Sequence, residues 1–241
     1  MTVDKASVLT RLAAAVVARD GQPLAVRLCR ACVDITGAEA GVITLAYTAA
    51  ERVTVAVTSP IASRLEDLQE LVGEGPGFDA DRTGVVAQGK VGDHLNADDV
   101  RWPMFSSAAA EQTGPAVLYA FPMRPDGEHI LGVLTLCQLG EHPPPIPTDA
   151  AQFAVDAVGA ALVREPGWDV DTDQDESWLS RARVHQATGA VIAQLGIPAD
   201  DALALMRAHA YAQSTTLAAV ANDIVQRRLD FSQIIDRNEP S

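Results

Sequence analysis

The fold of the C-terminal part is decided by the stretch Val184-His-Gln-Ala-Thr-Gly-Ala-Val-Ile192 and the residues that follow it. Apolar residues recur there every three or four positions, which is the period of an amphipathic helix. The stripe consists of Val184, Ala187, Val191 and Leu195. Gly196 ends this helix, Pro198 begins a second one, and a third starts near Thr216. The sequence therefore predicts an all-α three-helix bundle over residues 177–237.

The first of these helices carries a second stripe on another side. Its members are Trp178, Ala182, His185, Gly189 and Ile192. A helix with two such faces needs two packing partners, its own bundle and another subunit. We therefore expect a homodimer.

Residues 1–165 alternate between helical and strand patterns. Helices are expected near residues 12–18, 24–35, 60–72, 103–113 and 150–161, and strands near 42–47, 52–58, 85–91, 116–124 and 130–138. Pro125-Asp-Gly-Glu128 between the last two strands is typical of a hairpin turn, and Gly73-Glu-Gly-Pro-Gly77 is expected to be a loop. The pattern indicates an α/β (α+β) domain with an antiparallel or mixed sheet flanked by helices.

Charge divides the chain unevenly. Six of the twelve residues from Glu165 to Glu176 are acidic, so residues 166–176 are expected to be an acidic linker. Residues 1–176 hold 12 Lys and Arg against 26 Asp and Glu, whereas residues 177–241 hold six of each. A phosphate backbone would be repelled by the first part, so a nucleic acid must be bound by a few placed groups of the last part.

Composition and motifs exclude several classes of function. With 48% hydrophobic and 21% charged residues the chain is globular, and its apolar run at 12–18 is too short to span a membrane. The spacing of Cys29 and Cys32 suits zinc, but a second ligand pair is absent, so both are expected on the apolar side of a helix. We find no catalytic constellation and expect no enzyme, no cofactor and no metal. Three cysteines indicate a reducing compartment, the cytoplasm.

Residues 179–229 resemble the ANTAR module of bacterial antitermination regulators, which is a three-helix RNA-binding unit. The resemblance rests on Ala187 and Gly189 in the first helix, on Ala202-Leu-Ala-Leu-Met-Arg-Ala-His-Ala-Tyr211 in the second, and on Leu217-Ala-Ala-Val-Ala221 in the third. Thr188 stands where many members carry lysine. This departure removes one cationic donor from the first helix.

The resemblance implies that RNA is bound by basic, polar and aromatic groups on the bundle surface. The candidates are Arg181, Arg183, Gln186, Thr188, Arg207, Tyr211, Arg227 and Arg228. Arginine suits phosphate because its planar fork donates two hydrogen bonds at once, and Tyr211 could stack on an unpaired base. Arg207 and Tyr211 are four residues apart on one helix, a spacing that suits plain packing equally well.

Residues 1–165 are similar to the GAF domains that precede this module in actinobacterial regulators. The similarity rests on Gly73-Glu-Gly-Pro-Gly-Phe-Asp-Ala80, Asp98-Asp-Val-Arg-Trp-Pro103, Phe121-Pro-Met123 and Leu131-Gly-Val-Leu134. It implies a central antiparallel sheet with a pocket for a small molecule. Related sequences often have cysteine where this one has Gly77, so thiol-based sensing is not expected there.

These observations predict a dimeric RNA-binding transcription antitermination regulator. Its GAF domain would sense a small molecule or a partner and control the paired ANTAR bundles, which would hold a hairpin-containing transcript leader. The alternative is a non-catalytic sensor or protein-interaction module whose bundle only dimerises and binds no RNA. The neutral charge of residues 177–241 and Thr188 favour that alternative.

Overall fold

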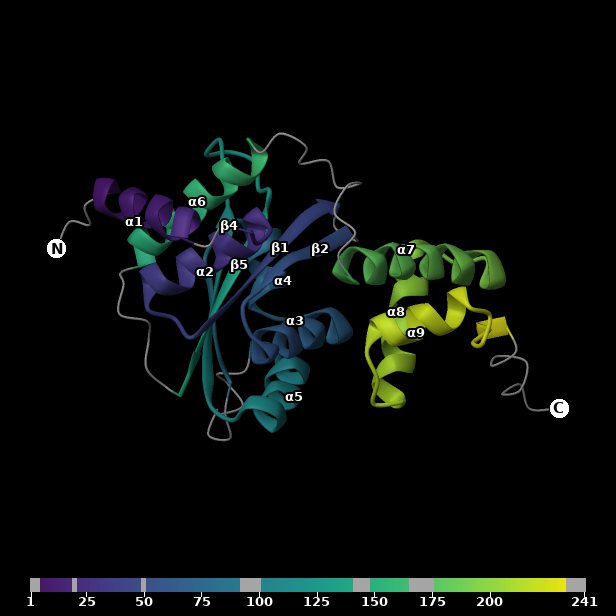
Figure 1. The fold of residues 1–241 in the computed structure, drawn as a ribbon. Coiled ribbons are helices and arrows are strands. Elements are labelled where there is room, and N and C mark those ends of the chain that lie inside the picture. Colours follow the sequence, from purple (N-terminus) through teal and green to yellow (C-terminus); the bar gives the residue numbers. More distant parts are fainter. Residues whose placement is uncertain are drawn as a thin grey trace. The chain divides into compact units, whose positions relative to one another are not determined.

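The computed structural model describes residues 5–18, 21–48, 51–91, 101–140, 148–164 and 176–232. The chain forms two compact units that divide near residue 172. The first unit is built on a five-stranded antiparallel sheet, and the second is helical (Figure 1). The predicted acidic linker falls almost entirely outside the described residues, except that Glu176 is already the first residue of a helix.

The sheet of the first unit has the strand order β2-β1-β5-β4-β3, and every neighbouring pair is antiparallel. The strands are β1 (Ala40–Thr48), β2 (Glu51–Val57), β3 (Ala87–Val91), β4 (Ala116–Met123) and β5 (Gly132–Leu139). The predicted hairpin joins β4 to β5, with Gly127 at a φ of 84°. The expected antiparallel sheet is thus confirmed.

In the described part of the first unit, six helices accompany this sheet. They are α1 (Lys5–Ala18), α2 (Leu24–Thr36), α3 (Pro60–Val72), α4 (Pro76–Thr83), α5 (Pro103–Thr113) and α6 (Thr148–Val163). The sequence analysis did not predict α4. It expected residues 73–77 to be a loop, which is wrong for Pro76 and Gly77, the first two residues of this helix. Pro76 occupies the first turn, where its fixed φ favours a helix and its missing N–H costs no hydrogen bond.

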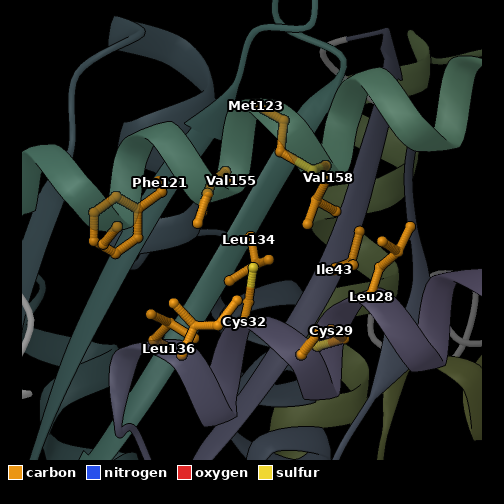
Figure 2. Close-up of a cluster of buried hydrophobic side chains, with 14 of the residues drawn as sticks. Leu28, Cys29, Cys32, Ile43, Phe121, Met123, Leu134, Leu136, Val155 and Val158 are labelled. Carbon is orange, nitrogen blue, oxygen red and sulfur yellow. The ribbon is translucent and has the colours of Figure 1, made fainter. Parts of the chain in front are cut away.

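One face of the sheet packs an apolar core against α2 and α6 (Figure 2). Ile43, Leu134 and Phe121 project from the strands toward Leu28 of α2 and Val155 of α6, and all five side chains are buried. The cysteines of α2 belong to this core, where neither is exposed at all. Burial raises the pKa of the Cys32 thiol to about 12. Their expected place on the apolar side of a helix is confirmed.

The second unit contains the three predicted helices: α7 (Glu176–Leu195), α8 (Ala199–Ala212) and α9 (Leu217–Val225). Thr216 caps α9, because its hydroxyl oxygen accepts a hydrogen bond from the Ala219 N–H at 3.1 Å. Small buried residues, among them Ala187, Ala202, Ala210 and Ala221, line the contacts between the helices. This confirms the all-α bundle, whose short side chains let the helices pack closely.

The bundle is closed by residues beyond its third helix. Phe231 is buried in the bundle core, and its N–H donates to Oε1 of Gln194 at 3.1 Å. The Phe231 ring also meets the His209 ring edge-on at 5.5 Å between centroids. The compact helical unit therefore extends at least to residue 231. Within the described residues, no helix has the length and apolar character needed to cross a membrane.

Candidate functional sites

The first helix of the bundle presents part of the predicted RNA-binding set to solvent. Arg183, Gln186 and Gly189, spaced three residues apart, are all exposed, whereas Ala187 and Val191 belong to the buried core of the bundle. Gly189 belongs to the second apolar stripe of this helix, the one predicted to contact another subunit, and it is exposed in the single chain. The side chains of Trp178, Arg181, Ala182 and His185 lie outside the described part of the structure, so the homodimer stays a prediction.

Thr188 is tied into the bundle. Its hydroxyl donates to the Val184 carbonyl oxygen at 2.8 Å and contacts the Met206 sulfur at 3.7 Å, and the residue is half-buried. The position where the resemblance leads one to expect lysine is thus occupied by a short side chain turned toward α8. It offers RNA neither a charge nor an unengaged hydroxyl group.

The second helix exposes an aromatic ring. Tyr211 is 57% exposed and lies outside the bundle core, which excludes the packing interpretation for this residue. Leu205 on the same helix is also exposed. Arg207 is half-buried, and its Nε is already engaged as a hydrogen-bond donor. Of the two residues, Tyr211 is the more accessible to a ligand.

Two arginines follow the third helix. Arg227 is exposed and adopts a left-handed backbone with φ 56°, which its N–H supports by donating to the Ile224 carbonyl oxygen at 2.9 Å. Arg228 is also exposed, but its Nε donates to Oδ1 of Asp223 at 3.0 Å, so its charge is paired. The bundle therefore offers Arg183 and Arg227 as its more accessible described cations.

A cluster of buried polar side chains lies on the other face of the sheet from the apolar core. Glu66 of α3 is its centre: Oε1 accepts from the Thr44 hydroxyl at 2.8 Å, and Oε2 accepts from Nε2 of Gln69 at 2.8 Å. Oε1 of Gln69 in turn accepts from the Gly77 N–H at 2.7 Å. This chain of hydrogen bonds connects β1 through α3 to the first turn of α4.

Arg52 of β2 joins this polar cluster. Its Nη2 lies 3.4 Å from Oε1 of Glu66, and its guanidinium stacks 4.0 Å from the centroid of the Phe78 ring. Burial raises the pKa of Asp81 on α4, an effect that the charge of Arg52 opposes. The polar cluster thus consists of the buried side chains of Thr44, Arg52, Glu66 and Gln69, with the half-buried Phe78 and Asp81 beside it.

Sequence reasoning missed the polar cluster. Alternation along the strands does place Thr44, Arg52 and Thr54 on one face, and Glu66 and Gln69 fall next to the apolar stripe of α3. Charged residues are nevertheless almost always exposed unless they are paired, and the partner of Arg52 is 14 residues away. Only the packing of α3 on the sheet reveals the pair.

Among the described residues, no group of His, Cys, Asp and Glu could hold a metal ion.

Comparisons with known proteins give one assignment. The ANTAR domain family matches residues 176–225, which span α7 to α9. No curated protein matches the sequence.

Solved structures share only weak likenesses with the chain. The GAF domain of nlh2 from A. aeolicus is 13% identical with a TM-score of 0.39, over 64% of this chain and 90% of that one. SdiA in complex with octanoyl-rac-glycerol is 13% identical with a TM-score of 0.44, over 92% and 94%. The phytochrome photosensory core module of Stigmatella aurantiaca is 15% identical with a TM-score of 0.38, over 83% and 42%.

The family match and the geometry of the bundle agree on the same three helices. Residues 176–225 are therefore an ANTAR domain, and in the same chain they follow a unit with the antiparallel α/β architecture expected of a GAF domain.

Proposed function

We propose that the protein is an RNA-binding transcription antitermination regulator of the cytoplasm, without catalytic activity. The match of the ANTAR family to a compact three-helix unit carries this proposal. Arg183 and Gln186 on α7, Tyr211 on α8 and Arg227 after α9 supply exposed groups of the types that bind RNA. The N-terminal unit would act as the sensor, and dimerisation would pair two bundles on one structured RNA.

Arg183 is the sharpest place to test RNA binding. In a gel shift with an RNA that carries two adjacent hairpins, the full chain should bind, and Arg183→Glu should bind more weakly. For Arg183→Gln, the slope of log Kd against log salt should fall by about 0.7–1, which is the contribution of one phosphate contact. Unchanged affinity and slope in both variants would exclude Arg183 from the RNA interface.

Arg64 provides a matched control. It is an exposed arginine of α3 in the sheet unit, so Arg64→Glu makes the same change of charge outside the bundle. RNA retention by this variant should equal that of the parent chain. Equal losses in the Arg64 and Arg183 variants would mean that only net charge matters, and the proposed surface would then be wrong.

A second candidate function is a sensor whose bundle only associates with protein. It is favoured by the pairing of Arg228 with Asp223 and by the engaged hydroxyl of Thr188, since both reduce the groups left for RNA. This function predicts no salt-dependent retention of the double-hairpin RNA, together with a dimer in light scattering. Salt-dependent retention of this RNA would favour the RNA-binding regulator over the protein-interaction module.

A further inference from the structure

The guanidinium of Arg52 has donors that nothing in the described structure uses. Its side chain is only 6% exposed, and of its three nitrogens Nη2 alone has a partner among the described residues, the long contact to Glu66 at 3.4 Å. Nε and Nη1 are both buried, and neither has a hydrogen-bond partner among the described residues. Buried donors of folded proteins are nearly always paired, so two orphans on one guanidinium require an explanation.

The surroundings of Arg52 keep these donors in place. The Phe78 ring covers one face of the guanidinium at 4.0 Å. Glu66 cannot turn to satisfy the remaining N–H groups, because Thr44 and Gln69 already hold its two oxygens at 2.8 Å each. Arg52 is therefore positioned by contacts that leave Nε–H and Nη1–H for another molecule.

The charges around Arg52 select the kind of molecule. Glu66 already offsets the positive charge, and Asp81 adds a second acidic group nearby. A bound anion would meet two carboxyl groups around one guanidinium in a buried setting, where unpaired charge is most costly. A neutral molecule needs to supply only hydrogen-bond acceptors.

We propose that Arg52 is the recognition group of a small-molecule site formed by β2, α3 and α4, and that its ligand is an uncharged compound whose carbonyl oxygens accept from Nε–H and Nη1–H. This inference rests on the proposed sensing role of the sheet unit. Because Gln69 bonds the Gly77 N–H and Phe78 contacts the guanidinium, the ligand would act on the first turns of α4. The two nitrogens are closed to solvent, so entry requires the covering side chains to move.

The Nε–H resonances of ¹⁵N-labelled arginine in the full chain test the site directly. The Arg52 resonance is identified by its loss in Arg52→Lys. Uracil and succinimide, which each carry two carbonyl oxygens, serve as neutral probes, and acetate and inorganic phosphate serve as anions. At least one neutral probe should shift the Arg52 resonance saturably, and the anions should not. Arg27 of α2 is the control: its Nε–H is also buried without a partner among the described residues, but its Nη1 donates to the Val16 carbonyl oxygen at 3.2 Å. A single unpaired Nε–H is therefore not enough to form the proposed site, and the Arg27 resonance should not respond.

Other outcomes overturn the proposal. A response to acetate or phosphate alone would make the site an anion site, and no response to any probe would leave water as the partner of Arg52. Asp81→Asn removes one of the two carboxyl groups near Arg52 and should therefore increase the response to acetate. An unchanged response would contradict the proposed selection by charge. The gel shift without probes reports RNA binding separately, so failure of this site and failure of the proposed regulator are distinguishable.

Discussion

Gly75 is a position where a single methyl group should damage the sheet unit strongly. Its backbone has φ 142° and ψ 173°, a conformation that is essentially restricted to glycine and costs other residues about 1–3 kcal/mol. The Cβ of an alanine would also lie 2.5 Å from Oε1 of Gln69 and 2.6 Å from its Cγ. Gln69 is completely buried, so it must shift and release the Gly77 N–H.

An unpaired buried hydrogen-bonding group costs about 1–3 kcal/mol, so Gly75→Ala should destabilise the sheet unit by about 2–6 kcal/mol in total. With a denaturant slope of about 2 kcal/mol per molar urea, the midpoint should fall by about 1–3 M. Hydrogen exchange of peptides from β1 and α3, measured against urea concentration, gives this midpoint for the sheet unit in the intact chain.

Gly127→Ala is the matched control. Gly127 also has a positive φ, 84°, but no atom lies within 4 Å of an added Cβ. Its cost should be the backbone strain alone, about 1–2 kcal/mol. If the two variants lower the midpoint equally, then Gln69 is not held against Gly75, and the polar cluster is not packed as described.

Three further predictions concern the bundle arginines and the buried thiols. Arg227→Gly relieves a left-handed backbone and should stabilise the bundle by up to about 1–2 kcal/mol in urea unfolding, while RNA affinity in the gel shift falls; a gain or no change in affinity would remove Arg227 from the interface. Asp223→Asn releases Arg228 and should raise RNA affinity severalfold, with stability changed by less than about 1 kcal/mol because the pair is exposed; weaker RNA binding would contradict this. Cys29, Cys32 and Cys137 have thiol pKa values raised by burial, so they stay protonated at pH 8 and should resist iodoacetamide until urea is added, as mass spectrometry can follow. The raised pKa values also predict that the free energy of unfolding falls as the pH rises above about 8.5, because only the unfolded chain then loses the thiol protons. Rapid labelling of the folded chain would refute both expectations.

Short-range signals predicted much of the fold. The apolar period from Val184 to Leu195, the glycine at 196 and the Thr216 cap were enough to place three helices, because each signal acts within one or two turns of chain. The same holds for the hairpin at Gly127. Helix α4 was missed because Gly75-Pro-Gly77 is typical of loops, and its first turn is tied to α3 by the hydrogen bond from the Gly77 N–H to Gln69.

The candidate sites divide along the same line. The residue types were enough to select Arg183, Gln186 and Tyr211 as RNA-binding candidates. Whether a candidate side chain is exposed or engaged depends on how the bundle packs: Tyr211 is accessible, the Thr188 hydroxyl is hydrogen-bonded and Arg228 is paired with Asp223. The polar cluster around Arg52 was decided by tertiary structure alone. A charge is buried only where distant residues hold it, and Glu66 and Phe78 reach Arg52 because α3 and α4 fold back onto β2. The sequence by itself determined the strands, the ANTAR pattern and every described helix except α4, since these depend on neighbouring residues, whereas the folded chain decided which polar groups meet and which are left for a ligand.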